Sequence, residues 1–502
     1  MNYDFEDKDA INQPLLFHSM STDDDESIHA TRKCSPSSRS KWFAVPAVED
    51  QGIKPVSENE RTHTRIIDNF TFWFSIASNV LTMALGVLGV HLFGLDFKVA
   101  LGCIVLANLI NSLPGAFFIT MGHRLGMRQI IITRYAYGYA GSRGVAVTNI
   151  LSSIGWSILN SIQAGQLLVA LMSSIPLAAA ILIMSFITVT VAIFGYAVLH
   201  HFERWAWIPT WISILIMLAT SATKLSTTTP TSSSSSNDIG AIISYATIIY
   251  SAPSIWSTSA ADFTVKQSTR FDSRYVAFLS YAGGVIPVIL LETFGLILAT
   301  TALSGQEGWE DANDVGGLIH AALSPLGIWG NILIGILALS TITHNIPNAY
   351  GLGLMLQNLF PSIQHWIFTL AGVCIYTTFA IAGSEHLYSL FQNLLPFMTY
   401  FYGPYVVILI LEHFYFRQGS FKQYSRDAWN QADLLPQGIA AWSATLLGYF
   451  SAFLGIKQPW YVGPLAQVIG VEGGDVGVPI AMVVAAATYI PLRKIERKRG
   501  RK

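Results

Sequence analysis

Long apolar runs alternate with short polar breaks along the chain from Phe70 onward. A helix needs about 20 apolar residues to cross a bilayer core of about 30 Å, and most of the runs reach that length. The pattern predicts an all-α polytopic membrane protein with twelve transmembrane helices. The first six spans are expected at about 70–94, 97–121, 146–172, 176–199, 205–224 and 239–261. The second six are expected at about 276–303, 326–352, 364–382, 387–412, 438–456 and 478–492.

The basic residues predict the orientation of these spans, because Lys and Arg concentrate in the cytoplasmic loops of membrane proteins. With both termini in the cytoplasm, all but three of the 29 Lys and Arg residues fall on the cytoplasmic side. The three exceptions are Lys98, Lys224 and Lys457. An odd number of spans would mix the basic residues between the two sides, so the distribution favours an even number.

The polar segments predict the domain organisation. Residues 1–65 hold an acidic cluster among scattered Ser and Pro residues, which predicts a disordered cytoplasmic tail. Residues 226–238 are rich in Ser and Thr and predict a flexible linker on the outer side, and residues 493–502 form a basic cytoplasmic tail. The spans then fall into a first half at 66–225, a second half at 239–415, and two further spans with their loops at 416–492.

Composition narrows the class of protein further. Of 502 residues, 52% are hydrophobic and only 12% are charged, against about 25% charged in a typical soluble domain. This balance excludes a disordered chain and a nucleic-acid binder, and the net charge of −1 argues against a strongly charged partner. The three Cys residues are too far apart for a metal or redox motif.

Two spans carry residues that interrupt a membrane helix. The first span contains Asn79 and Thr82, and the sixth contains Pro253, which lacks an N–H group and would free backbone carbonyls near mid-membrane. These spans open the two halves, and interrupted helices at corresponding places point to the binding site of a secondary transporter. Small residues there could instead serve helix packing, but their paired placement favours transport.

The third span places Trp156 and Asn160 four residues apart, so both side chains lie on one helix face. An indole ring offers a stacking surface, and an amide offers both a donor and an acceptor, a pair that suits a planar heterocycle such as a nucleobase. Trp256 in the sixth span would allow an aromatic sandwich. The alternative is a lipid-facing Trp beside an interhelical Asn.

Polar residues at membrane depth also mark the seventh and eighth spans. The eighth contains His344, Asn345, Pro347 and Asn348. Such residues are costly to place in hydrocarbon, so their presence indicates a function. Glu292 is the one acidic residue deep in a span, in the seventh. It is either a carboxyl group paired within the bundle or part of a proton relay.

Four stretches together resemble fungal purine-cytosine permeases of the nucleobase-cation-symport family, and the resemblance runs from about Asp68 to the end of the twelfth span. They are Gly155-Trp156-Ser157-x-x-Asn160, Pro253-x-x-Trp256 with Ala261-Asp262-Phe263, Asn345-Ile346-Pro347-Asn348-Ala349-Tyr350, and Phe194-Gly195-Tyr196 leading to His201-Phe202-Glu203-Arg204.

The resemblance implies a five-plus-five inverted repeat of the LeuT-like kind with two extra helices, working as a proton-coupled importer at the plasma membrane. It also implies roles for individual residues: Trp156 and Trp256 stack the base, Asn160 and Asn348 bond its edge, Asn345 and Pro347 shape the eighth span, and Thr82 forms a polar site in the first. Glu203 matches an acidic position needed for function, at the cytoplasmic end of the fourth span.

His344 departs from the family, which usually has a pair of Asn residues before Ile-Pro-Asn. A His at this place could alter base selectivity or take part in proton transfer, because its pKa lies near working pH. It could equally act as a neutral hydrogen-bonding substitute. With Pro253, Glu203 and Glu292, it is a candidate for gating or coupling.

The predicted function is import of cytosine and of purines such as adenine, hypoxanthine and guanine, by proton symport with alternating access. Another planar heterocycle of the vitamin B6, uracil or allantoin type is the alternative substrate. A membrane enzyme or receptor is the alternative class; an enzyme would need clustered catalytic groups, whereas the 12 His residues are scattered. A channel would need a polar stripe or filter sequence, and none is present. We expect no metal and no cofactor other than the coupling proton, and no nucleic-acid partner.

Overall fold

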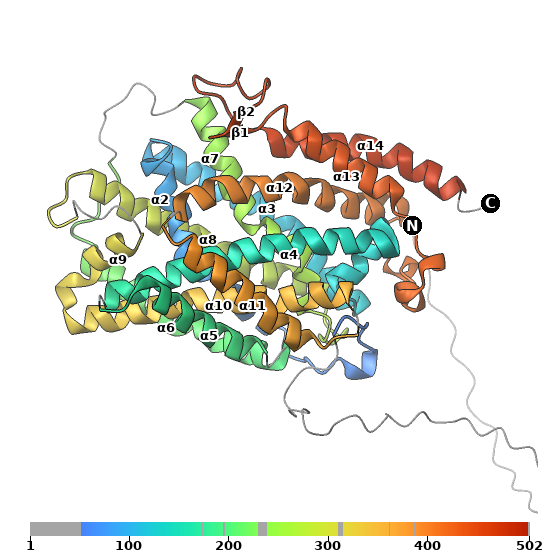
Figure 1. Cartoon of the computed structure of the whole chain (residues 1–502), viewed down its shortest axis with the longest axis horizontal. Helices are drawn as coiled ribbons and strands as arrows, with labels where there is room; N and C mark the ends of the chain where they lie inside the picture. The colour runs from blue at the N-terminus through green and yellow to red at the C-terminus, as the bar shows by residue number, and fades with distance from the viewer. Residues whose placement is uncertain are drawn as a thin grey trace, which may run out of the picture. The chain divides into compact units, whose positions relative to one another are not determined.

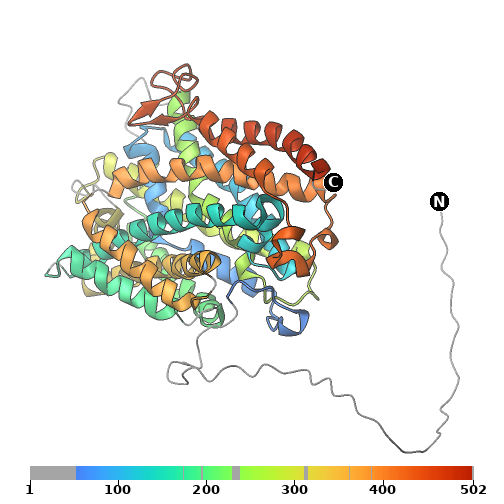
Figure 2. The same ribbon diagram turned by 45° about the vertical axis from the view of Figure 1, so that its right-hand side comes forward.

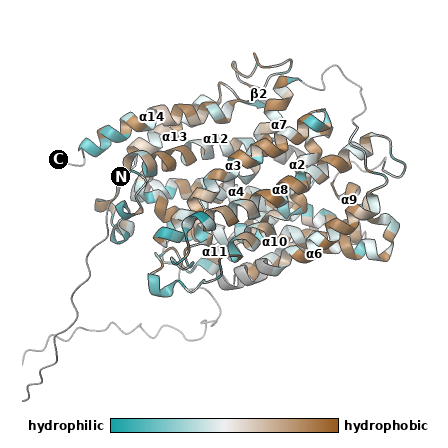
Figure 3. Ribbon diagram, turned by 180° about the vertical axis from the view of Figure 1, so that it is seen from behind, coloured by the Kyte–Doolittle hydropathy of each residue, from teal (hydrophilic) through white to brown (hydrophobic). Residues whose placement is uncertain are grey.

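The apolar runs fold into helices because the hydrocarbon core of a bilayer offers no hydrogen-bond partners. A helix satisfies nearly all of its backbone N–H and C=O groups internally. The computed structural model describes residues 52–499 except 173, 194–195, 229–237, 310–314, 361 and 386, without the side chains of 194–204, 255 and 386–392. The helices pack side by side in a bundle, with apolar colours along their lengths and hydrophilic colours towards the helix ends and loops (Figure 1, Figure 3).

The first half contains α1 (Asp68–Ala77), α2 (Val80–His91), α3 (Phe97–Leu125), α4 (Gln129–Leu171), α5 (Leu177–Ala192) and α6 (Tyr196–Ser221), after the 3-10 turn η1 (Glu58–Glu60). The second half contains α7 (Ile239–Ser251), the 3-10 segments η2 (Ala252–Thr258) and η3 (Ala260–Phe263), α8 (Ser273–Leu303), α9 (Val315–Leu323), η4 (Ser324–Leu326), α10 (Ile328–Leu359), α11 (His365–Ala382) and α12 (Leu387–Leu411).

The last part of the chain begins with the π-helical turn η5 (Glu412–Phe416) and continues with η6 (Phe421–Gln423), η7 (Arg426–Asn430), η8 (Ala432–Leu434), α13 (Ile439–Ala452), the antiparallel pair β1 (Lys457–Gln458) and β2 (Tyr461–Val462), and α14 (Gly477–Arg499). α13 and α14 lie side by side along one side of the bundle (Figure 1, Figure 2).

Each expected span corresponds to a helix or a broken pair of helices. Within the described ranges, eight helices are long and apolar enough to cross a membrane, or nine if α1 and α2 form one bent span. α5, α13, the apolar part of α6 and the α9–η4 segment are shorter apolar helices. The polytopic membrane class is therefore confirmed, whereas the count of twelve spans stays a prediction.

Helices of the two halves interleave in two groups. In the first group, α8 packs against α1, α2 and α3, and α3 also packs against α7. In the second group, α4 and α10 pack against each other and against α5 and α11. Both groups contain corresponding helices from each half, and the two broken helices belong to the first group. We call these the broken-helix group and the scaffold group.

Several predicted boundaries are wrong. α4 begins at Gln129 rather than near 146, and Gly138, with φ of 76°, marks a kink near its start. α6 begins at Tyr196, so Glu203 lies in this helix and not at the end of the fourth span; its side chain is outside the described part. α14 continues through Arg499, so the basic tail from 493 is largely helical. α9 and the β1–β2 pair were not predicted.

The end of the predicted disordered tail is also ordered. Residues 1–51 lie outside the described residues, but residues 52–65 pack on the bundle. The Val56 N–H group donates to the Gly126 carbonyl at 2.8 Å, and Arg61 Nη1 donates to the His123 carbonyl at 2.7 Å. The polar composition misled the prediction because this segment is held by backbone and side-chain hydrogen bonds to the bundle rather than by a core of its own.

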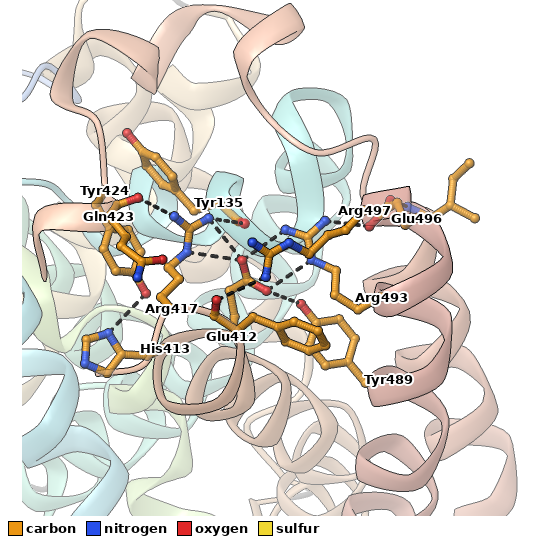
Figure 4. A network of polar contacts seen from close by, with 12 residues as sticks. Tyr135, Glu412, His413, Arg417, Gln423, Tyr424, Tyr489, Arg493, Glu496 and Arg497 are labelled. Carbon is orange, nitrogen blue, oxygen red and sulfur yellow. Dashed lines mark hydrogen bonds and ion pairs between the residues drawn. The ribbon is translucent and has the colours of Figure 1, made fainter. Parts of the chain in front are cut away.

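A buried ion network joins the last helix to the end of α12 (Figure 4). The Glu412 carboxylate accepts hydrogen bonds from Arg493 at 3.0 and 3.1 Å, from Arg417 at 3.1 Å and from the Tyr489 hydroxyl at 2.9 Å. Arg497 donates to the Phe416 carbonyl at 3.1 Å. A buried carboxylate with several donors is well compensated, and this contact explains why α14 extends beyond its apolar run.

The loop between α13 and α14 positions the start of α7. The Asp475 N–H group donates to Ser244 Oγ at 3.0 Å, and the Thr247 hydroxyl donates to the Asp475 carbonyl at 2.9 Å. The Asp475 carboxylate accepts from the Tyr400 hydroxyl at 2.5 Å, and burial raises the pKa of Asp475. α7, α12 and this loop are therefore linked at one residue.

α2 and α8 approach each other closely at two glycines. A Cβ atom on Gly86 would lie 1.8 Å from the Glu292 carbonyl oxygen, and one on Gly295 would lie 2.1 Å from the Met83 carbonyl oxygen. Only glycine permits this backbone contact. The contact places Glu292 against the first broken helix.

We expect Gly86→Ala to destabilise the protein by about 1–3 kcal/mol or more, because the methyl group must push α2 and α8 apart. Gly102→Ala on α3 is the control, since a Cβ atom there meets nothing within 4 Å. Thermal unfolding of the purified proteins in detergent tests this. Equal midpoints for the two variants would contradict the close contact.

Candidate functional site

The first span is broken between α1 and α2, as the sequence predicts. The two helices meet at a bend of 53°, and Asn79 has extended backbone angles. Its Oδ1 atom accepts from the Leu81 N–H group at 3.0 Å and so caps α2. Its Nδ2 atom donates to Asn160 Oδ1 on α4 at 2.8 Å, which ties the break to the scaffold group.

The break exposes the Ile76 carbonyl, and His344 on α10 bonds it. The distance from His344 Nδ1 to the Ile76 oxygen is 2.9 Å. Because a carbonyl oxygen only accepts, Nδ1 carries the ring proton and Nε2 presents a lone pair. Nε2 is buried and has no hydrogen-bond partner among the described residues.

The sixth span is broken at Pro253, also as predicted. α7 ends at Ser251 and the chain continues as 3-10 turns through η2 and η3. The Tyr250 carbonyl accepts from the Asn111 side chain of α3 and from the Ser254 hydroxyl, the latter at 3.0 Å. The proline thus frees backbone acceptors, and an amide from a neighbouring helix satisfies one of them.

A cavity of about 80 Å³ lies beside both breaks. Three tryptophans, Tyr281 and His344 form its aromatic part. The centroid of the His344 ring lies 6.2 Å from that of Trp156 and 5.3 Å from that of Trp256. Trp73 meets Trp256 edge-on at 5.5 Å. The aromatic walls with a few polar atoms suit a flat, partly polar ligand.

The structure brings six of the predicted residues to the cavity wall. They are Thr82, Trp156, Pro253, Trp256, Glu292 and His344. They come from α2, α4, η2, α8 and α10, so both groups of helices contribute. Residues that are distant in the sequence thus meet at one cavity, whereas their roles in binding or coupling stay a prediction.

The three predicted asparagines do not line the cavity. Asn160 lies one turn behind Trp156, and its Nδ2 atom donates to the Trp156 carbonyl at 2.8 Å. Asn345 lies 3.4 Å from both the Ser161 and Tyr376 hydroxyls. Asn348 is buried, and its Nδ2 atom has no hydrogen-bond partner in the described part of the chain. Their contact with a substrate stays a prediction.

Pro347 lies inside α10, which runs unbroken from Ile328 to Leu359. A proline removes one N–H donor from a helix interior, and here the helix continues past it. The expected role of Pro347 in shaping the eighth span therefore stays a prediction.

Sequence reasoning missed two residues of this region and did not predict the partner of a third, Asn79. Trp73 and Asn111 line the cavity, and Asn79 links the first break to Asn160. Asn79 and Asn111 were detectable as amides inside apolar runs. Trp73 carried no such signal, because a tryptophan near the end of a span reads as an interfacial anchor.

A broken helix at the start of each half, with a cavity beside the breaks, is the arrangement that points to the binding site of a transporter. Residues 55–470 match the family of permeases for cytosine/purines, uracil, thiamine and allantoin. The chain therefore belongs to this family, and it is a membrane transporter rather than an enzyme.

The chain is similar to fungal relatives along most of its length. It is 34% identical to the purine-cytosine permease fcyB of Emericella nidulans, over 90% of this chain and 89% of that one. It is 32% identical to the purine-cytosine permease FCY2 of Saccharomyces cerevisiae, over 91% and 88% of the two chains. The vitamin B6 transporter TPN1 of Saccharomyces cerevisiae is 27% identical, over 92% and 90%.

The fold is that of Mhp1, a transporter of the nucleobase-cation-symport-1 family. The closed structure of Mhp1 with bromovinylhydantoin bound superposes with a TM-score of 0.68 at 15% identity, over 90% of this chain and 96% of that one. Its inward-facing structure superposes with a TM-score of 0.65 at 15% identity, over 90% and 94%. The predicted LeuT-like repeat architecture and the predicted family are confirmed.

His344→Phe is expected to lower stability, because the Ile76 carbonyl loses its donor and an unpaired buried acceptor costs about 1–3 kcal/mol. His344→Asn keeps an N–H donor and is the matched control. The thermal unfolding midpoint in detergent should fall clearly below wild type for His344→Phe and much less for His344→Asn. A larger loss for His344→Asn would contradict the assigned hydrogen bond.

Proposed function

We propose that this transporter imports cytosine and purines across the plasma membrane by proton symport, with alternating access to the cavity and both termini in the cytoplasm. The observation that carries the proposal is the aromatic cavity between the two helix breaks. The names of the two fungal relatives above 30% identity, both purine-cytosine permeases, support the substrate class.

The wall chemistry fits a nucleobase. Indole rings stack on the face of any base, and stacking contributes about 1–3 kcal/mol per base. His344 Nε2 is an acceptor without a protein partner among the described residues, and a ring or exocyclic N–H group of a base would satisfy it. A small number of polar groups within an apolar site fixes orientation.

The first break supports a proton over a sodium ion as the coupling ion. Sodium sites in transporters with broken helices use carbonyl oxygens released by unwinding. Here the His344 N–H group points at the Ile76 oxygen, and a donor hydrogen repels a cation from the same position. The hydrogen bond thus takes one oxygen that a sodium site would use.

Vitamin B6 is the second candidate substrate. Its pyridine ring is flat and carries hydrogen-bonding groups, so it meets the same physical requirements, and a relative at 27% identity is named a vitamin B6 transporter. Uracil, thiamine and allantoin occur in the description of the family. A direct comparison of substrates separates these candidates.

We expect concentrative uptake of radiolabelled cytosine, adenine or hypoxanthine, stimulated by external acid, in cells that lack their own carriers. Uracil and pyridoxine are measured beside them. Accumulation of pyridoxine alone would replace the nucleobase proposal with the vitamin B6 alternative. Absence of uptake for all five compounds would contradict the proposed function.

Trp256→Ala should raise the KM for the preferred base about 5- to 150-fold, since it removes stacking of about 1–3 kcal/mol. Trp329→Ala is the matched control, because Trp329 lies in the first turn of α10, outside the cavity, and is 68% exposed. Surface expression of both variants is followed with a fluorescent tag. A normal KM for Trp256→Ala would remove this residue from the binding site.

A further inference from the structure

The acidic side chain of Glu292 is buried in the middle of α8, in the broken-helix group. It lies on α8 with no exposed surface, and Asn108 Nδ2 of α3 donates to its Oε2 atom at 2.5 Å. The Oε1 atom is buried and has no hydrogen-bond partner among the described residues. No Lys or Arg of the described part pairs with it, in contrast to Glu412 with its two arginines.

Glu292 belongs to the same cavity as the aromatic residues. It lines this cavity together with Thr82 and Leu85 of α2, and its backbone carbonyl is the atom that Gly86 approaches. Glu292 and the proposed substrate site therefore share one cavity. Glu292 also lies at the contact between α8 and the first broken helix.

Few other titratable groups face this carboxyl group. From α7, the Tyr245 hydroxyl donates to the Leu85 carbonyl at 3.2 Å, and from α3, the Cys103 thiol lies 3.8 Å from the Ile242 carbonyl. Tyr281, on α8 itself, donates to the Leu109 carbonyl at 2.9 Å. Among the described residues, α1 and α2 contribute no titratable side chain to the cavity wall.

His344 is a further acid–base group on the wall, on α10 of the scaffold group. Its Nδ1–H group is committed to the Ile76 carbonyl, which fixes Nε2 as an acceptor for the substrate. The Glu292 carboxyl group bonds no backbone group at a helix break. In the described structure its only hydrogen bond is the one from the Asn108 amide. The two groups therefore have different roles in the cavity.

We propose that the carboxyl group of Glu292 is the binding site of the coupling proton, an inference that rests on the proposed proton symport. A hydronium ion from the outer solution transfers a proton to the carboxylate and leaves as water. On the inner side the carboxylic acid returns the proton to water. Asn108 holds the carboxyl group in place in both states.

The coupling follows from the cost of a buried charge. One amide donor does not compensate a carboxylate in a dry, low-dielectric place, so the charged form needs water from an open cavity. The neutral acid needs none, and α2 and α8 can close around it. A proton on Glu292 and a base between the tryptophans then both favour the closed cavity, and each increases the affinity for the other.

The test is Glu292→Gln, which has the shape of the protonated acid and cannot titrate. We expect substrate counterflow in proteoliposomes to persist, because exchange needs no net proton movement. Accumulation driven by an inward proton gradient should be lost, so that the internal substrate concentration only reaches the external one. The dependence of the uptake rate on external pH should become flat.

Glu307→Gln is the matched control, since Glu307 is exposed in the loop after α8, and it should keep gradient-driven accumulation. Asn108→Ala is the second variant, measured whether or not Glu292→Gln folds. It removes the donor that stabilises the carboxylate, so protons should bind more tightly and the pH of half-maximal uptake should move upward.

The inference is overturned if Glu292→Gln accumulates substrate with the pH dependence of wild type, or if Asn108→Ala folds and leaves the pH profile unmoved. A failure of the proposed function would give a different result from a failure of this inference. In that case wild-type protein itself shows no accumulation of any nucleobase under a proton gradient.

Discussion

The backbone polar groups released by two helix breaks must be satisfied at membrane depth, and the rest of the site depends on how this is done. The Ile76 carbonyl is bonded by His344 of α10, and the Tyr250 carbonyl by Asn111 of α3. Asn79 reaches across to Asn160 of α4. Each of these partners comes from another helix, so the bonds that make the breaks tolerable also fix the walls of the cavity between them.

The same hydrogen bonds show which helices each break is attached to. His344 and Asn160 join the first break to the scaffold group, whereas Asn111 joins the second break to α3, inside the broken-helix group. In the proposed alternating-access cycle, motion of one group against the other would exchange the bonds at the first break. A substrate that accepts from or donates to these groups can replace them, which links binding to movement.

Much of this architecture could be predicted from the sequence, because it is encoded locally. Apolar runs, Pro253 and the two tryptophans Trp156 and Trp256 each carry their own signal, and together they pointed to the breaks and to one wall of the site. Contacts between distant residues were not predictable, such as the pairing of Asn79 with Asn160, which occupies the amide expected to bond the edge of the base. Long-range backbone contacts at residues 52–65 and the early start of α4 escaped the hydropathy pattern for the same reason.

The central claim is that the cavity between the two breaks is the substrate site, and a structure of the cytosine-bound protein by electron cryomicroscopy tests it most directly. The account predicts a base that stacks on Trp156 or Trp256 with a polar atom within hydrogen-bonding distance of His344 Nε2. Cytosine bound instead in the second cavity, which Asp238, Glu472 and Asp475 line beside the start of α7, with the aromatic cavity empty, would contradict it.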